Sequence, residues 1–284
     1  MPVADIDGIP TSFDVVGAGP PLLMLSPGGF NATMENWSSF GRYRELQMVK
    51  HLSARFTCVI FDRRESGGSG GRLEVLGWDA YATQARGLLD HLGLGPAHVL
   101  GGCAGCSVAL ALARRHPDSV RSLILFSPAG GPRYRLAQHS RFARHQAFLE
   151  EHGPAAVAEL AAATDGTFSS DPRLGPWAAV LRRDPRFAGR YTGVDARVHA
   201  RIVAGTARTM FDRDTVSGAE PEELMAMPVP ALIFPGRDDS HATSAARYLE
   251  ECLPHPEYVD VAVEDQDETL VQGRMLEFLA RAGG

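Results

Sequence analysis

The alternation of apolar and polar residues divides the chain into short strand-like runs and longer helix-like stretches. The strand-like runs are mostly apolar and are bounded by glycine, proline or charged residues, which is typical of buried strands. Most of them lie in the first half of the chain, and two more lie near its C-terminus. The predicted strands are residues 12–16, 21–26, 56–62, 97–102, 120–128, 228–236 and 257–263.

Helix-like stretches separate these strands. Residues 78–94 place apolar side chains at helical spacing, and a glycine interrupts the pattern near their end. Strands that alternate with helices in this way favour a mostly parallel sheet, because each helix returns the chain to the same edge. The pattern therefore predicts an α/β protein with a doubly wound sheet and helices on both faces.

The middle of the chain has a different pattern. It lacks strand-like runs and carries helix-like stretches rich in Ala, Arg and His at residues 141–153, 154–163 and 195–211. We expect residues 1–130 and 222–284 to form the α/β core and residues 131–221 to form a helical lid. Such a lid covers the carboxyl edge of the sheet, where ligands of open α/β sheets bind.

Composition and charge limit the classes of partner that the protein can have. The 284 residues are 44% hydrophobic and 22% charged, as in ordinary globular proteins. The net charge of −6 argues against nucleic acid, no apolar run is long enough to span a membrane, and no secretory signal precedes the core. We expect a cytoplasmic protein whose partner is a small molecule, and the sequence leaves open whether it forms a homodimer.

The stretch 98–117 contains the pattern Gly101-Gly102-Cys103-Ala104-Gly105 between a predicted strand and a predicted helix. A residue on such a turn projects above the sheet, and flanking glycines allow close backbone approach. The helix N-terminus favours negative charge, so Cys103 should ionise more readily than a free thiol. Cys103 is the candidate nucleophile, and the N–H of Ala104 is a candidate oxyanion donor.

Four stretches resemble, in order, motifs of the α/β-hydrolase fold superfamily. They are the loop 17–37, the turn 61–71 with Glu65 where glycine is usual, the elbow 101–105 and the acid-bearing segment 234–241. The resemblance implies this fold, with cysteine in place of the usual serine nucleophile. It also implies a second oxyanion donor at Gly29 or Phe30.

The family's usual histidine is missing, because the loop after the last predicted strand contains none. We expect His241, two residues after Asp239, to act as the base for Cys103 in a transposed arrangement. The acid that orients His241 is left open. It is either Asp238 or Asp239 beside the histidine, or an acidic residue of the last loop, such as Asp265.

Other histidines and the arginines add alternatives. His139, His145, His152 and His199 lie in the predicted lid, and any of them could reach Cys103. No pair of histidines has the spacing of a zinc motif, and we expect neither a metal nor a cofactor. The many lid arginines suggest an anionic substrate.

Three functional hypotheses follow. The first is a cysteine-dependent acyl-transfer enzyme that hydrolyses an ester, thioester or lactone, or passes the acyl group to an acceptor, through a Cys103 thioester. The second is a non-catalytic or lyase-type member that binds a small molecule under the lid. The third is a redox-active dithiol of Cys103 and Cys106.

Overall fold

A computed structural model describes residues 1–212 and 215–283 of the chain. Its centre is a single eight-stranded sheet in the order β1-β2-β4-β3-β5-β6-β7-β8. The antiparallel strands β1 and β2 form one edge, and the other strands run parallel, which confirms the predicted sheet. The strands are β1 (Val3–Ile6), β2 (Ile9–Val16), β3 (Pro21–Leu25), β4 (Thr57–Phe61), β5 (Ala97–Gly102), β6 (Val120–Phe126), β7 (Ala231–Phe234) and β8 (Pro256–Tyr258).

Helices cover both faces of the sheet because successive side chains of its buried strands point to opposite faces. Leu23 and Leu25 of β3 belong to one hydrophobic core, whereas Leu22 and Met24 belong to the other. The first core includes side chains of α4 (Trp78–Leu92), α5 (Gly105–Arg115), α10 (Pro221–Met225) and α11 (Thr243–Cys252). The second includes side chains of α1 (Asn36–Ser39), α2 (Gly41–Leu46), α3 (Met48–Leu52) and α12 (Glu268–Ala282).

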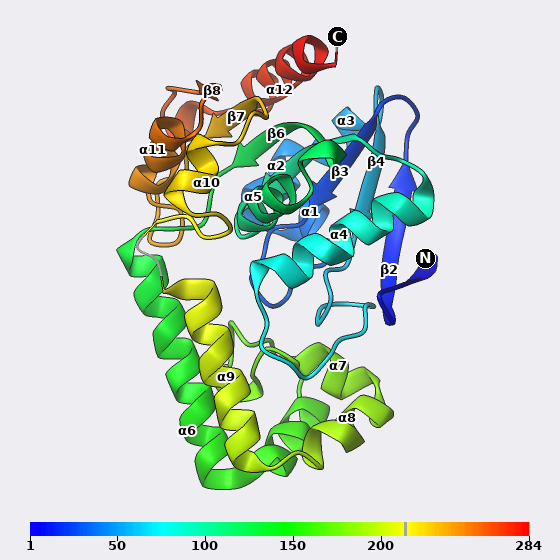
Figure 1. Ribbon diagram of the computed structural model, residues 1–284, viewed down its shortest axis with the longest axis vertical. Coiled ribbons are helices and arrows are strands. Elements are labelled where there is room, and N and C mark those ends of the chain that lie inside the picture. The colour runs from blue at the N-terminus through cyan, green and yellow to red at the C-terminus, as the bar shows by residue number, and fades with distance from the viewer. Residues whose placement is uncertain (213–214, 284) are drawn as a thin grey trace.

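After β6 the chain leaves the sheet, and residues 132–211 form a separate group of helices, seen below the core in Figure 1. The two long helices α6 and α9 pack side by side, and α6 bends at Gly153, where the backbone is not helical. We call this group the α6–α9 segment. Its helices are α6 (Pro132–Ala163), α7 (Ala178–Arg183), α8 (Pro185–Thr192) and α9 (Ala196–Phe211).

The edge strands differ from the sequence prediction. β1 was not predicted, because it is short and only every second side chain is buried. The run 257–263 gives only the three-residue β8, since the chain turns at Val259 and then enters a 3-10 helix. The 3-10 helices are η1 (Pro117–Ser119), η2 (Pro172–Leu174) and η3 (Val263–Asp265). Within the described residues, no helix combines the length and apolarity needed to cross a membrane.

Candidate active site

Cys103 occupies a sharp turn between β5 and α5. Its φ of 54° lies in the left-handed region, which non-glycine residues rarely adopt and which is frequent at functional sites. Gly105 permits the turn, because a Cβ there would overlap the carbonyl oxygen of Leu25 on the neighbouring strand. The sharp turn leaves the Cys103 side chain partly exposed at the carboxyl edge of the sheet.

The backbone N–H groups of Gly28 and Ala104 lie beside the Cys103 thiol and help to lower its pKa. Ala104 was expected in this position. Gly28 was not: the sequence prediction had Gly29 or Phe30 as the second donor. Gly29 lies on the wall of the same cavity as Cys103.

Phe30, the alternative to Gly29 as predicted second donor, has a side chain with a packing role. Only 7% of the residue is exposed, and its ring packs edge-on against Phe142 of α6 and against Phe168. The loop after β3 is therefore held against the α6–α9 segment by an aromatic cluster.

Arg63, which the sequence analysis did not single out, supports the same loop from below. Its guanidinium donates to the carbonyl oxygens of Gly28, at 2.6 Å, and Gly29. It also lies over the ring of Tyr81, 4.8 Å from the centroid. Burial lowers the pKa of Arg63, but its guanidinium still provides a fixed group of donors. Its only sequence signal is its place in the turn 61–71.

Asp238 and His241 lie on one tight turn after β7. Nδ1 of His241 is 2.9 Å from both carboxylate oxygens of Asp238, and the backbone N–H of His241 donates to the same carboxylate. When Nδ1–H donates to a carboxylate, Nε2 carries the lone pair of the neutral ring. Nε2 is buried, has no oxygen or nitrogen partner among the described residues, and faces the Cys103 thiol.

The interaction between Cys103 and His241 changes both pKa values. Burial opposes ionisation of the thiol, but the hydrogen bond and charge of His241, with the two N–H groups, hold the pKa of Cys103 below its ordinary value. Burial also disfavours the imidazolium, yet Cys103 and Asp238 outweigh it and raise the pKa of His241 to about 9. These shifts favour a thiolate–imidazolium pair.

The sequence left the acid open, and the described contacts distinguish the candidates. Asp239 pairs with Arg133 at 2.6 Å, and both side chains are largely exposed. Asp265 ends η3 and forms no hydrogen bond or ion pair with His241. Among the acids left open, the described hydrogen bonds join Asp238 to the imidazole.

The loop after β8, where the family's histidine was missing, is fixed by Gln266. The Gln266 side chain is buried and donates to the carbonyl oxygens of Pro235 and Val261, at 3.3 and 3.1 Å. Arg42 donates to its backbone carbonyl oxygen at 2.6 Å. The loop thus has a structural anchor, and His241 comes instead from the loop after β7.

The predicted lid histidines are placed away from Cys103. His139 bonds to the carbonyl oxygen of Phe211, and His145 to that of Arg173, within or beside the α6–α9 segment. His199 is buried and bonds to the Tyr191 carbonyl oxygen. His152 lies 3.7 Å from Glu151.

Cys106, the second thiol of the proposed dithiol, is fully buried. Its Sγ donates to the carbonyl oxygen of Gly101 at 3.1 Å, and burial raises its pKa well above the ordinary value. Cys103 and Cys106 are both free thiols. A buried thiol of raised pKa is a poor partner for thiol–disulfide exchange.

The Cys103–His241 pair opens into a cavity of about 230 Å³ between the sheet edge and the α6–α9 segment. No acidic side chain of the described residues lines it. In the described chain there is also no group of three or more His, Cys, Asp or Glu residues able to hold a metal ion. Residues on its two walls include Gly28, Gly29, Cys103, Ser240 and His241 from the core and Tyr134, Gln138, Arg141, Thr167 and Ser169 from the α6–α9 segment.

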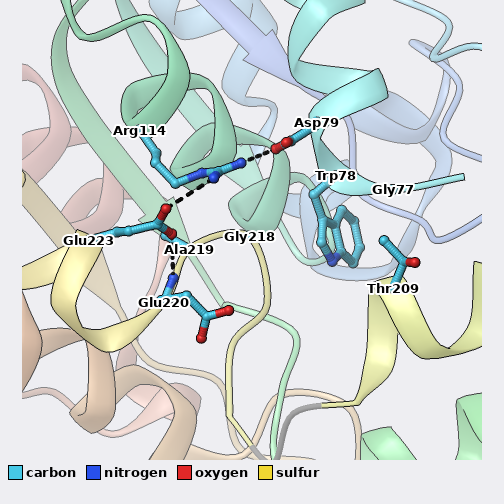
Figure 2. A pocket seen from close by; sticks show the side chains of 9 residues that line it. All are labelled: Gly77, Trp78, Asp79, Arg114, Thr209, Gly218, Ala219, Glu220 and Glu223. Carbon is cyan, nitrogen blue, oxygen red and sulfur yellow. Dashed lines mark hydrogen bonds and ion pairs between the residues drawn. The ribbon is translucent and has the colours of Figure 1, made fainter.

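A second cavity, of about 190 Å³, lies away from Cys103 (Figure 2). Arg114 of α5 bridges Asp79 of α4 and Glu223 of α10 there, so three helices are joined by ion pairs. The residues that line it include no cysteine, serine or histidine. We interpret this cavity as a gap around a structural charge bridge.

The fold and the order of the motifs define an α/β-hydrolase. The model of the alpha/beta hydrolase fold family matches residues 21–255, so the chain belongs to this family. Among solved structures, the enol-lactonase from Burkholderia xenovorans superposes with a TM-score of 0.63 and 21% identity, covering 98% of this chain and 100% of that chain. At this identity the likeness shows the fold.

Curated relatives match a smaller part of the chain. A 2-hydroxymuconate semialdehyde hydrolase of Pseudomonas is 33% identical over 125 residues, which are 43% of this chain and 41% of the relative. The uncharacterized hydrolase YraK of Bacillus subtilis is 27% identical over 125 residues, 43% of this chain and 42% of the relative. The chain thus spans less than half the length of these relatives.

Proposed function

We propose that the protein is a cysteine-dependent acyl-transfer enzyme acting on a small ester, thioester or lactone. One observation carries the proposal: the Cys103 thiol at the elbow faces His241, which Asp238 orients at 2.9 Å. A nucleophile, a base and a group that orients the base are the parts that nucleophilic catalysis requires. Relatives named as a semialdehyde hydrolase and an enol-lactonase agree with a small carbonyl substrate.

In the acylation step, the Cys103 thiolate attacks the substrate carbonyl carbon. The new C–S bond places negative charge on the carbonyl oxygen, and we expect the backbone N–H groups of Gly28 and Ala104 to stabilise it, with Gly29 on the same cavity wall. When the intermediate collapses, the bond to the alkoxide or thiolate leaving group breaks, and that group takes the proton from Nε2 of His241. A thioester on Cys103 and a neutral His241 remain.

In the deacylation step, water or another acceptor attacks the thioester. Neutral His241 accepts the proton of the attacking group at Nε2, and the Cys103 thiolate leaves as the new acyl product forms. The pair then returns to its thiolate–imidazolium state. Water as acceptor gives hydrolysis, whereas an alcohol, amine or thiol gives acyl transfer.

The test is to trap the acyl-enzyme with p-nitrophenyl acetate and measure intact mass. We expect a burst of p-nitrophenolate and one acetyl group on the wild type and on Cys106→Ala, and neither on Cys103→Ala. His241→Ala should slow acylation by about 100-fold, the usual contribution of a positioned acid–base group. A wild type that is never acetylated at Cys103 would refute the proposal and favour the ligand-binding hypothesis.

A further inference from the structure

Arg141 lies in the wall of the Cys103 cavity, on a face of α6 that points toward the nucleophile. Tyr134, Gln138 and Arg141 are spaced four and three residues apart, so they share one side of the helix. All three line the same cavity as Cys103 and His241. A cationic side chain is thus presented to the space a substrate would occupy.

No described carboxylate pairs with this cation. At the start of the same helix, Arg133 pairs with Asp239, and many other arginines also meet an acidic side chain. The one hydrogen bond that Arg141 makes in the described chain is to the Gln138 side-chain oxygen, at 2.7 Å. Since no acidic residue of the described chain lines the cavity, the positive charge of Arg141 has no carboxylate partner there.

The guanidinium is partly buried and held in place. Burial lowers the pKa of Arg141, which reflects the water removed from around its charge. The ring of Phe168 lies 6.0 Å from the guanidinium carbon, and the Gln138 oxygen fixes one nitrogen. Most of the five donors stay available in a planar group, a geometry that matches a carboxylate.

The other arginine near Cys103 cannot serve this purpose. Arg63 is buried, and its Nη2 donates to the carbonyl oxygens of Gly28 and Gly29. Arg141 is therefore the guanidinium that remains open to a ligand in this cavity.

We propose that Arg141 binds a carboxylate of the substrate, so that the enzyme acts on acyl compounds that carry a free carboxylate, such as monoesters or monothioesters of short dicarboxylic acids. This inference rests on the proposed acyl-transfer function for its chemistry. The binding site itself does not depend on turnover. The two can therefore be tested separately.

The binding test measures how far glutarate protects Cys103 from alkylation by neutral iodoacetamide. Neutral glutaramide is the matched ligand, and Arg144→Met changes an exposed arginine one turn further along the same helix. We expect glutarate to protect the wild type and Arg144→Met, whereas Arg141→Met needs about 10- to 100-fold more glutarate, the usual effect of losing a charge-assisted hydrogen bond. Equal protection of Arg141→Met and wild type would overturn the proposal, as would no protection of the wild type.

The substrate test compares kcat/KM for p-nitrophenyl hemisuccinate and p-nitrophenyl butyrate. Arg141→Met should lower the value for the hemisuccinate by about 10- to 100-fold more than the value for the butyrate. Arg141→Lys, which keeps the charge without the planar fork, should lie between. If both esters acylate Cys103 and the variant treats them alike, the carboxylate site fails and the acyl-transfer function stands. If neither ester acylates Cys103 but glutarate protection requires Arg141, the acyl-transfer function fails and the carboxylate site stands.

Discussion

Two neighbouring carboxylates, Asp238 and Asp239, provide a matched pair for testing the acid. Asp238→Asn removes the negative charge that helps to raise the pKa of His241 to about 9. The imidazolium then becomes less stable, so its support for the Cys103 thiolate weakens and the pKa of the thiol rises. Asp239 makes no contact with the imidazole, since it pairs with the exposed Arg133.

We therefore expect Asp238→Asn to slow iodoacetamide alkylation of Cys103 at neutral pH by roughly 3- to 10-fold, a range that allows for solvent screening of the half-exposed carboxylate. Asp239→Asn should leave the rate unchanged. The measurement is the rate of mass gain as a function of pH. The wild-type alkylation rate should change with pH a second time near pH 9, because His241 loses its proton there. Equal effects of the two variants would contradict the assignment of Asp238.

The residue scale is also where the sequence predicted least. The elbow pattern predicts Cys103 as a nucleophile, and the short spacing from Asp239 drew attention to His241. The choice of Asp238 depends on hydrogen bonds inside a four-residue turn, which adjacent identical residues cannot reveal. The role of Arg141 depends on which carboxylates are absent around it in space.

At the scale of elements, the return from α9 to the core depends on Gly218. It has a φ of 117°, and a Cβ there would overlap the carbonyl oxygen of Ser107 and lie 2.9 Å from its carbonyl carbon. Ser107 belongs to α5, the helix that begins just after Cys103. Because the obstacle is helix backbone, it cannot move without displacing the nucleophile turn.

We expect Gly218→Ala to lower the free energy of unfolding by about 2 to 4 kcal/mol, from overpacking together with backbone strain. Gly189→Ala is the control, since a Cβ at this exposed position of α8 meets nothing within 4 Å. That variant should be unchanged or up to about 1 kcal/mol more stable, because alanine favours helix. Urea unfolding measures both, and a Gly218→Ala variant as stable as wild type would refute the close contact.

Elements were more predictable than the site because apolar periodicity reports burial directly. The inner strands are buried on both faces and read as apolar runs, so all five were located. Edge strands carry a weaker signal, as β1 and β8 show: each is half-buried or alternating. The long helices α4 and α9 were located within a few residues by their spacing.

At the scale of the whole molecule, the turn after β4 joins the core to the α6–α9 segment. Trp177, next to α7, donates to the backbone carbonyl oxygen of Arg72 in this turn at 2.8 Å. Beneath it, Glu65 is fully buried in the left-handed conformation, at a φ of 66°, and pairs with Arg64 at 3.0 Å. Burial raises the pKa of Glu65 to about 7, although Arg64 partly offsets it.

This raised pKa makes stability depend on pH with a definite sign. Below about pH 4.5 Glu65 is protonated in both the folded and the unfolded chain, so it contributes no pH dependence. Between about 4.5 and 7 the folded chain keeps a proton that the unfolded chain has lost, and the free energy of unfolding therefore falls as pH rises. Above about pH 7 Glu65 is ionised in both the folded and the unfolded chain. The decrease in the free energy of unfolding is then complete, at up to about 3 kcal/mol.

Glu65→Gln isolates this contribution, because the amide fills the same space and does not titrate. We expect the stability of wild type relative to Glu65→Gln to decrease between about pH 4.5 and 7 and then to stay constant, as measured by urea unfolding across that range. Other groups titrate in both proteins and cancel in the difference. A relative stability that increases with pH would mean that Arg64 holds Glu65 ionised, and the turn joining core and α6–α9 segment would then rest on a buried ion pair.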